Sequence, residues 1–269
     1  MEERVRISID ANGVAEVALV RGDKMNALDA AMFTAIQAAI ERLTHEPGLR
    51  AVVLHGEGKA FCAGLDMGRF AAMGAGERKG DMGLAGRTHG LANGPQQVAL
   101  GWRNVPVPVI AAVHGVAFGG GLQVALGADW RLLAPGTRMS VMEIKWGLVP
   151  DMAGMVLLRE LLRDDVAREL IYTGRIVEAE EAVALGLGTR VCADPLAQAR
   201  ELAQSIAQRS PTAVRAAKRL LNQASRVLDA SAAALLLAES EEQIRLIGSP
   251  NQVEAIKANL EKRLPVFSA

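Results

Sequence analysis

The sequence lacks features that are typical of several common classes of protein. Aromatic residues make up only 3% of the 269 residues, which disfavours a surface that stacks nucleic-acid bases. Basic and acidic residues number 30 each, so no charge excess indicates nucleic acid or a membrane surface as a partner. The two cysteines, Cys62 and Cys192, lie far apart and give no disulfide framework. This usage favours a reducing compartment, and we expect a cytoplasmic protein.

The sequence also lacks the patterns of membrane-spanning, metal-binding and nucleotide-binding proteins. The longest apolar stretches are interrupted by proline, glycine or charge, so none is expected to span a bilayer. Residues 1–4 contain no apolar stretch, and we expect no signal peptide. The four histidines have no metal-ligand spacing, so no metal is expected. There is no Walker loop, and the glycines of 119–121 lack dinucleotide-binding spacing. Apolar residues, in contrast, are half of the chain, which is enough for one large domain.

Hydrophobic patterning predicts alternating strands and helices in the first part of the chain. Residues 5–10 and 14–20 alternate around Asn12-Gly13, as in a β-hairpin. Asp29 is the expected N-cap of the first helix. Strands are expected at 51–55, 109–114 and 128–134, helices at 28–43, 98–103 and 122–128, and a loop that covers a site at 74–94. After residue 153 the pattern is helical, over 155–163, 166–173, 179–185, 196–209, 211–226, 230–248 and 253–263.

Glycine-rich turns follow two of the predicted strands. Gly119-Gly120-Gly121 follows strand 109–114 and opens a predicted helix. Backbone N–H groups at such a junction are unpaired and suit a developing negative charge. Ala63-Gly64 follows strand 51–55 in a similar way. Most glycine turns are only turns, but two of them could supply the converging N–H groups of an oxyanion hole.

Two carboxylates, Glu143 and Asp151, lie in a mostly apolar segment. Burial beside Met142, Ile144 and Trp146 could raise the pKa of Glu143 into the range that suits proton transfer. The alternative is structural: Glu143 pairs with Lys145 or Arg138, and Asp151 caps the next helix. The amide of Gln123 cannot act as a general base at neutral pH. Cys62 is interpreted as a packed residue rather than a nucleophile, and His114 as a hydrogen-bonded core residue.

In their order and spacing, these motifs resemble the crotonase superfamily, the enoyl-CoA hydratase/isomerase family, over nearly the whole chain. Residues 21–28 are similar to the family's early CoA-contact segment, and residues 61–66 and 112–121 to its two oxyanion motifs. Residues 210–219 and 261–263 are similar to its C-terminal helices.

The resemblance implies an α/β fold, a spiral of β-β-α turns with a helical C-terminal trimerisation region. It implies a core at 1–195, a helical region at 196–269, a homotrimer or hexamer, and an acyl-CoA thioester as substrate with no separate cofactor. The N–H groups of Ala63 and Gly120 would bind the thioester oxygen, and Glu143 with Asp151 would move a proton. The implied substrate contacts are Asp23, Lys24, Met25, Ala27, Gly64, Leu65, Asp66, Gln123 and Lys262.

The chain also departs from the family pattern. Family hydratases use two glutamates, at the positions of Gln123 and Glu143, and one of the two is absent here. Dienoyl-CoA isomerases carry an aspartate at the position of Asp151. Isomerisation is therefore favoured over hydration; the alternatives are a hydratase with a water oriented by Gln123, a thioester or carbon–carbon hydrolase, and a non-catalytic acyl-CoA-binding protein. Trp102, Trp146 and the loop 74–94 are expected to shape the acyl pocket, while chain length and pathway stay open.

Overall fold

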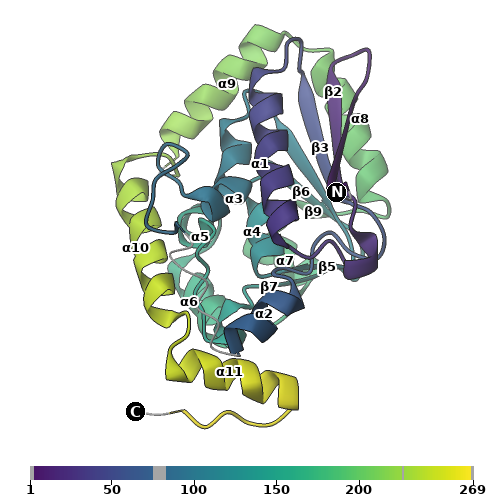
Figure 1. Cartoon of the computed structure of the whole chain (residues 1–269). Helices are drawn as coiled ribbons and strands as arrows, with labels where there is room; N and C mark the ends of the chain where they lie inside the picture. The colour runs from purple at the N-terminus through teal and green to yellow at the C-terminus, as the bar shows by residue number, and fades with distance from the viewer. Residues whose placement is uncertain (1–2, 75–82, 226, 268–269) are drawn as a thin grey trace.

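The computed structural model describes residues 3–74, 83–225 and 227–267 (Figure 1). Its centre is a six-stranded sheet with the order β1-β2-β3-β4-β6-β9. The first pair is antiparallel, as the hairpin prediction requires, and the others are parallel. The strands are β1 (Val5–Ile9), β2 (Val14–Leu19), β3 (Ala51–Gly56), β4 (Val109–Val113), β6 (Trp130–Leu133) and β9 (Arg190–Val191).

Helices cover both faces of this sheet. Along β3, Val52 and Leu54 pack into the larger core with α1 and α3, whereas Val53 packs with the alanines of α8. This alternation follows from the period of two in a strand and explains why the run is apolar throughout. Figure 1 shows α1 and α8 on opposite sides of the strands. The three helices are α1 (Ala30–His45), α3 (Gly94–Asn104) and α8 (Pro195–Ala207).

A smaller sheet, β5-β7-β8, gives the chain its β-β-α turns. Each of β4 and β6 is followed by a strand of this sheet, and β5 leads directly into α4. Cys62 forms a parallel bridge with Ala117, so the segment that follows β3 joins the same sheet. The segments around residues 63 and 120 therefore come together. The elements are β5 (Val116–Phe118), β7 (Arg138–Ser140), β8 (Val177–Glu178) and α4 (Gly120–Leu126).

Most of the remaining helices lie at one end of this arrangement, whereas α9 lies at the other end (Figure 1). In Figure 1, α10 runs beside α5, and α11 crosses below α2. The 3-10 helices are η1 (Gly22–Lys24) and η2 (Glu143–Trp146). The α-helices are α2 (Met67–Gly74), α5 (Gly154–Leu161), α6 (Asp164–Thr173), α7 (Ala179–Leu185), α9 (Pro211–Ala224), α10 (Ala230–Leu246) and α11 (Pro250–Glu261). No helix in the described ranges is both long and apolar enough to cross a membrane.

Most of the predicted elements are present. Asp29 caps α1 by accepting the Met32 N–H. The helix predicted from residue 98 instead begins at Gly94, because Asn93 and Gln96 form a capping box. The helix predicted from residue 122 begins at Gly120. Sequence patterning missed α2, η2 and the strands β5, β7, β8 and β9. The loop expected at 74–94 lies partly outside the described residues, at 75–82, and the boundary at 195 stays a prediction.

Candidate active site

The two glycine-rich turns lie against each other. Gly64 has φ +88°, and a Cβ there would come within 2.6 Å of the Phe118 carbonyl oxygen and 3.7 Å of the Gly120 nitrogen. Only glycine permits this conformation and this approach. Gly120 is the first residue of α4, so its N–H has no acceptor within the helix. The backbone N–H groups of two segments that are distant in sequence, around Gly64 and Gly120, therefore lie close together.

In the first turn, the backbone N–H that is free to face the pocket is that of Leu65 and not that of Ala63, among the described residues. The Ala63 N–H donates to the Met25 carbonyl oxygen at 2.9 Å, so the prediction that it is available for an oxyanion is corrected. Leu28 forms a parallel bridge with Leu65, donating to Gly64 O and accepting from Asp66 N. In such a bridge the N–H of Leu65 faces away from Leu28. It has no hydrogen-bond partner among the described residues and lies at the pocket.

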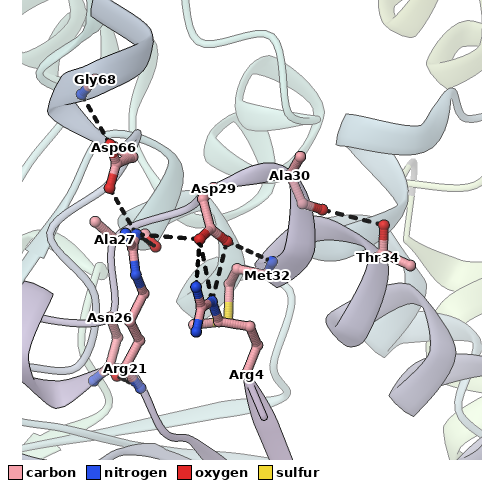
Figure 2. Close-up of polar contacts among 10 residues, drawn as sticks. All are labelled: Arg4, Arg21, Asn26, Ala27, Asp29, Ala30, Met32, Thr34, Asp66 and Gly68. Carbon is pink, nitrogen blue, oxygen red and sulfur yellow. Dashed lines mark hydrogen bonds and ion pairs between the residues drawn. The ribbon is translucent and has the colours of Figure 1, made fainter. Parts of the chain in front are cut away.

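A network of charged side chains holds the turn around Gly64 in position (Figure 2). Arg21 donates to Asp66 at 2.7 Å and lies 3.6 Å from Asp29, which also accepts from Arg4. The buried Asn26 side chain accepts the Arg21 N–H and donates to the carbonyls of residues 57 and 60. The network ties residues 21–28 to residues 57–66, and it uses the Asp66 carboxylate for the fold itself.

Glu143 lies in η2 and has two unlike carboxylate oxygens. Oε1 accepts a hydrogen bond from Gln123 Nε2 at 2.7 Å. Oε2 is buried and has no hydrogen-bond partner among the described residues. Burial raises the pKa of Glu143 to about 7, while the bond from Gln123 opposes this. Pairing of Glu143 with Lys145, the structural alternative, is not what is seen, because the Lys145 ammonium lies over the Trp146 ring.

Asp151 lies in the turn between η2 and α5. Burial, and then the charge of Glu143, raise the pKa of Asp151 to about 7, and a hydrogen bond with the Gln243 side chain opposes the rise. The alternative that Asp151 caps the following helix is wrong, because the N-cap of α5 is Ala153. Two carboxyls that titrate near neutral pH therefore share one site, which suits general acid–base chemistry.

A pocket of about 410 Å³ joins the donors and the carboxyls. This volume is within the range of small-molecule sites. Phe70 and Trp146 stack in its wall, with ring centroids 4.2 Å apart. Four of the chain's nine aromatic residues line it, so these scarce side chains gather at one place. The lining includes Phe33, Ala63, Gly64, Leu65, Arg69, Phe70, Met73, Leu84, Phe118, Gly120, Met142, Glu143, Trp146, Asp151, Met152 and Gln243.

Several predicted site residues lie away from this pocket. Asp23, Lys24, Met25 and Lys262 are exposed, and Ala27 is buried. Trp102, expected at the acyl pocket, is instead fully buried in the core, because it lies on the inner face of α3. Cys62 is buried, donates to Asn26 O and has a pKa raised to about 12 by burial, which fits a packed residue. His114 bonds Gly58 O as expected but is only half-buried.

Sequence reasoning missed Arg21, Asn26, Phe70, Gln243 and Glu239. The segment 21–28 drew attention to the first two, but only as CoA contacts. Gln243 and Glu239 lie on α10, where nothing in the helical pattern distinguishes them from other polar residues.

Comparisons with known proteins identify close relatives over the whole chain. The family model described as enoyl-CoA hydratase/isomerase matches residues 10–269. A Bacillus subtilis protein provisionally named enoyl-CoA hydratase/isomerase is 32% identical over 270 residues, covering 99% of each chain. A carnitinyl-CoA dehydratase of Escherichia coli O157:H7 is 32% identical, covering 97% of each. The solved enoyl-CoA hydratase/isomerase from Mycobacterium paratuberculosis superposes with a TM-score of 0.82 at 25% identity, covering 96% of this chain and 98% of its own.

Proposed function

Because this chain belongs to the enoyl-CoA hydratase/isomerase family, whose members are enzymes acting on acyl-CoA thioesters, we propose that it moves a double bond within an enoyl-CoA through an enolate. One observation carries this proposal. Glu143 lines the pocket and is held by Gln123 through Oε1, while its buried Oε2 has no hydrogen-bond partner among the described residues. We infer that Oε2 is the atom that takes a proton from a bound thioester.

The Leu65 and Gly120 N–H groups are proposed as the oxyanion hole. When Glu143 removes a proton from C2 of a 3-enoyl thioester, the electron pair moves into the carbonyl and oxygen becomes negative. Each donor that faces this oxygen typically contributes about 3 kcal/mol to transition-state stabilisation. Protonation at C4 by Glu143 or by Asp151 then returns the electrons and leaves a 2-enoyl thioester. Atoms and charge balance, with no cofactor beyond the CoA of the substrate.

Isomerisation is favoured over hydration because of Gln123. Its Nε2 donates to Glu143, and its Oε1 accepts the Met152 N–H at 2.9 Å. An amide engaged at both ends is poorly placed to activate a water. Hydration by Glu143 with a water oriented by Gln123 remains the second candidate, because relatives are named hydratases and a dehydratase.

Further parts of the proposal concern the CoA moiety and the assembly. Asp23, Lys24, Met25 and Lys262 are exposed and are proposed to contact the CoA arm and its phosphates. A homotrimer or hexamer stays the expected assembly, and the cytoplasm the expected location.

The test uses two substrates with the same acyl chain length. A 3-enoyl-CoA should be converted to the conjugated 2-enoyl-CoA, and a 2-enoyl-CoA should be hydrated at least about tenfold more slowly. Efficient hydration without a double-bond shift would contradict the isomerase assignment. Binding of both thioesters without any turnover would indicate the non-catalytic alternative.

A further inference from the structure

The turn that carries Asp151 receives most of its support from elsewhere in the chain. Ala153 has φ +65°, a left-handed conformation that costs a residue with a Cβ about 1 kcal/mol. As the N-cap of α5, its side chain cannot accept a hydrogen bond. The N–H groups of Met152, Ala153 and Met155 therefore need acceptors outside the turn.

Glu239, on α10, provides two of these acceptors. Its Oε1 accepts the Met155 N–H at 2.9 Å, and its Oε2 accepts the Ala153 N–H at 3.0 Å. Gln96 Nε2, from α3, donates to Oε2 at 3.1 Å. The side chain is 4% exposed, so the bonds are made away from water.

The same face of α10 reaches Asp151 one turn later. Gln243 accepts the Val149 N–H through Oε1 at 3.1 Å, and its side chain bonds the Asp151 carboxyl. Residues four apart lie on one face of a helix. Glu239 and Gln243 therefore hold both sides of the segment 149–155, while Gln123 holds Met152 from α4.

We propose that Glu239 is a positioning residue: its carboxyl group fixes the turn 151–155 and thereby the place of the Asp151 carboxyl in the pocket. Glu239 is outside the pocket lining in the described part of the chain and acts through Asp151. The proposal rests on the function proposed above, in which Asp151 takes part in proton transfer.

Charged groups from several elements lie around Asp151 and Glu239. The charge of Glu143, on η2, contributes to the raised pKa of Asp151. Burial raises the pKa of Glu239 to about 8, and the charge of Asp151 adds to this rise. Arg87 lies in the segment before α3 and donates a hydrogen bond to Ser240 of α10. Burial lowers the pKa of Arg87, and the charge of Glu239 opposes this. Because the pKa of Glu239 lies above that of Asp151, Glu239 still holds its proton while Asp151 ionises. Glu239→Gln therefore changes the hydrogen bonds of the turn and not the charge that acts on Asp151.

The experiment measures exchange of the C2 proton of an acyl-CoA in heavy water for Glu239→Gln. An amide can accept only one of the two N–H groups and turns its own donors toward the other. We expect kcat to fall at least about tenfold with KM within about threefold, because a displaced group acts on the transition state.

Ser240→Ala is the matched control. Ser240 is buried on the same helix, but its hydroxyl bonds Arg87 and Asn93 instead of the turn. This variant can lose stability but should keep the wild-type kcat and KM per folded molecule. Equal kcat and KM values for both variants, or a loss of rate in Glu239→Gln that only follows its folded fraction, would overturn the proposal.

If Glu239→Gln does not fold, the variant Glu239→Asp tests the positioning role instead. It keeps the carboxyl group but withdraws it by one methylene, so the hydrogen bonds to the turn are lost or lengthened and kcat should fall. An unchanged kcat would overturn the proposal. Absence of exchange in the wild-type protein would instead contradict the proposed function, so the two failures are distinguishable.

Discussion

Gln123 and Glu143, twenty residues apart, form one hydrogen-bonded unit. Gln123 Nε2 donates to Glu143 Oε1 at 2.7 Å, and Gln123 Oε1 accepts the Met152 N–H. The amide thus orients one carboxyl and also holds the turn that carries the other, Asp151. A residue that cannot titrate connects the two groups that titrate near neutral pH.

Replacing Gln123 by glutamate should change the reaction. The new carboxylate would lie at hydrogen-bond distance from Glu143, so the pair must share a proton and one of its pKa values rises. We expect hydration of a 2-enoyl-CoA to increase at least about tenfold and the double-bond shift to slow. Gln123→Met, which has similar volume and no charge, is the control. Equal hydration rates in both variants would contradict this role for Gln123.

Glu143 should cost the protein stability at neutral and alkaline pH. Its folded pKa of about 7 lies above its ordinary value of 4.5, so the native state holds a proton that the unfolded state has released. Stability is therefore fully present below about pH 4.5 and lost as pH rises through 7. Glu143→Gln removes this dependence and should raise the free energy of unfolding at pH 8 by up to about 3 kcal/mol, with little gain at pH 5.

Urea unfolding at both pH values measures this difference. The matched control is Glu41→Gln, which makes the same chemical change at a side chain that is 74% exposed. A difference between Glu143→Gln and wild type that does not change with pH would show that the carboxyl carries no raised pKa.

The Gly120 N–H can be deleted without changing the rest of the donor set. Gly120 is the first residue of α4, a position at which proline is tolerated. A Cβ there would meet the flexible Met152 Sδ at 2.8 Å and Leu28 Cδ1 at 2.9 Å, so Gly120→Ala controls for bulk while keeping the N–H. We expect C2 proton exchange in Gly120→Pro to be about 100-fold slower than in Gly120→Ala. Equal rates would remove this N–H from the oxyanion hole.

The Asn26 side chain should be essential to the first turn. It is fully buried, has φ +54° and makes three hydrogen bonds, so Asn26→Ala leaves buried groups unpaired. We expect a loss of about 2–4 kcal/mol in unfolding free energy. The exposed Asn12, which bonds the side chain of Gln204, is the control, and Asn12→Ala should cost about 0.5 kcal/mol or less. Similar losses for both would contradict the network in Figure 2.

Local patterns were enough to predict the large elements and several of the residues that line the pocket. The hairpin around Asn12-Gly13, the cap at Asp29 and the strand 51–56 depend on neighbouring residues, so a window of sequence contains their causes. The short strands β5, β7 and β8 depend on pairing with distant segments, which no local pattern shows.

The site itself shows the same limit. Motif order predicted one site for Gly120 and Glu143, and both line one pocket. It could not show whether the N–H of Ala63 or that of Leu65 is free to face that pocket. That choice depends on which N–H faces Met25 and which faces the pocket, a property of the bridge between Leu28 and Leu65. The contributions of Gln243 and Glu239 depend on how α10 packs against α5, which polar residues in a helical pattern do not reveal.

Exchange of the C2 proton of an acyl-CoA in heavy water, followed by mass spectrometry, tests the central claim most directly. It reports enolate formation without knowledge of the natural substrate. Glu143→Gln keeps the size of the side chain and removes the base, so the account predicts exchange by the wild-type protein and a rate at least about 100-fold lower in this variant. Exchange at an unchanged rate in Glu143→Gln, or none in the wild-type protein with acyl-CoA bound, would contradict it.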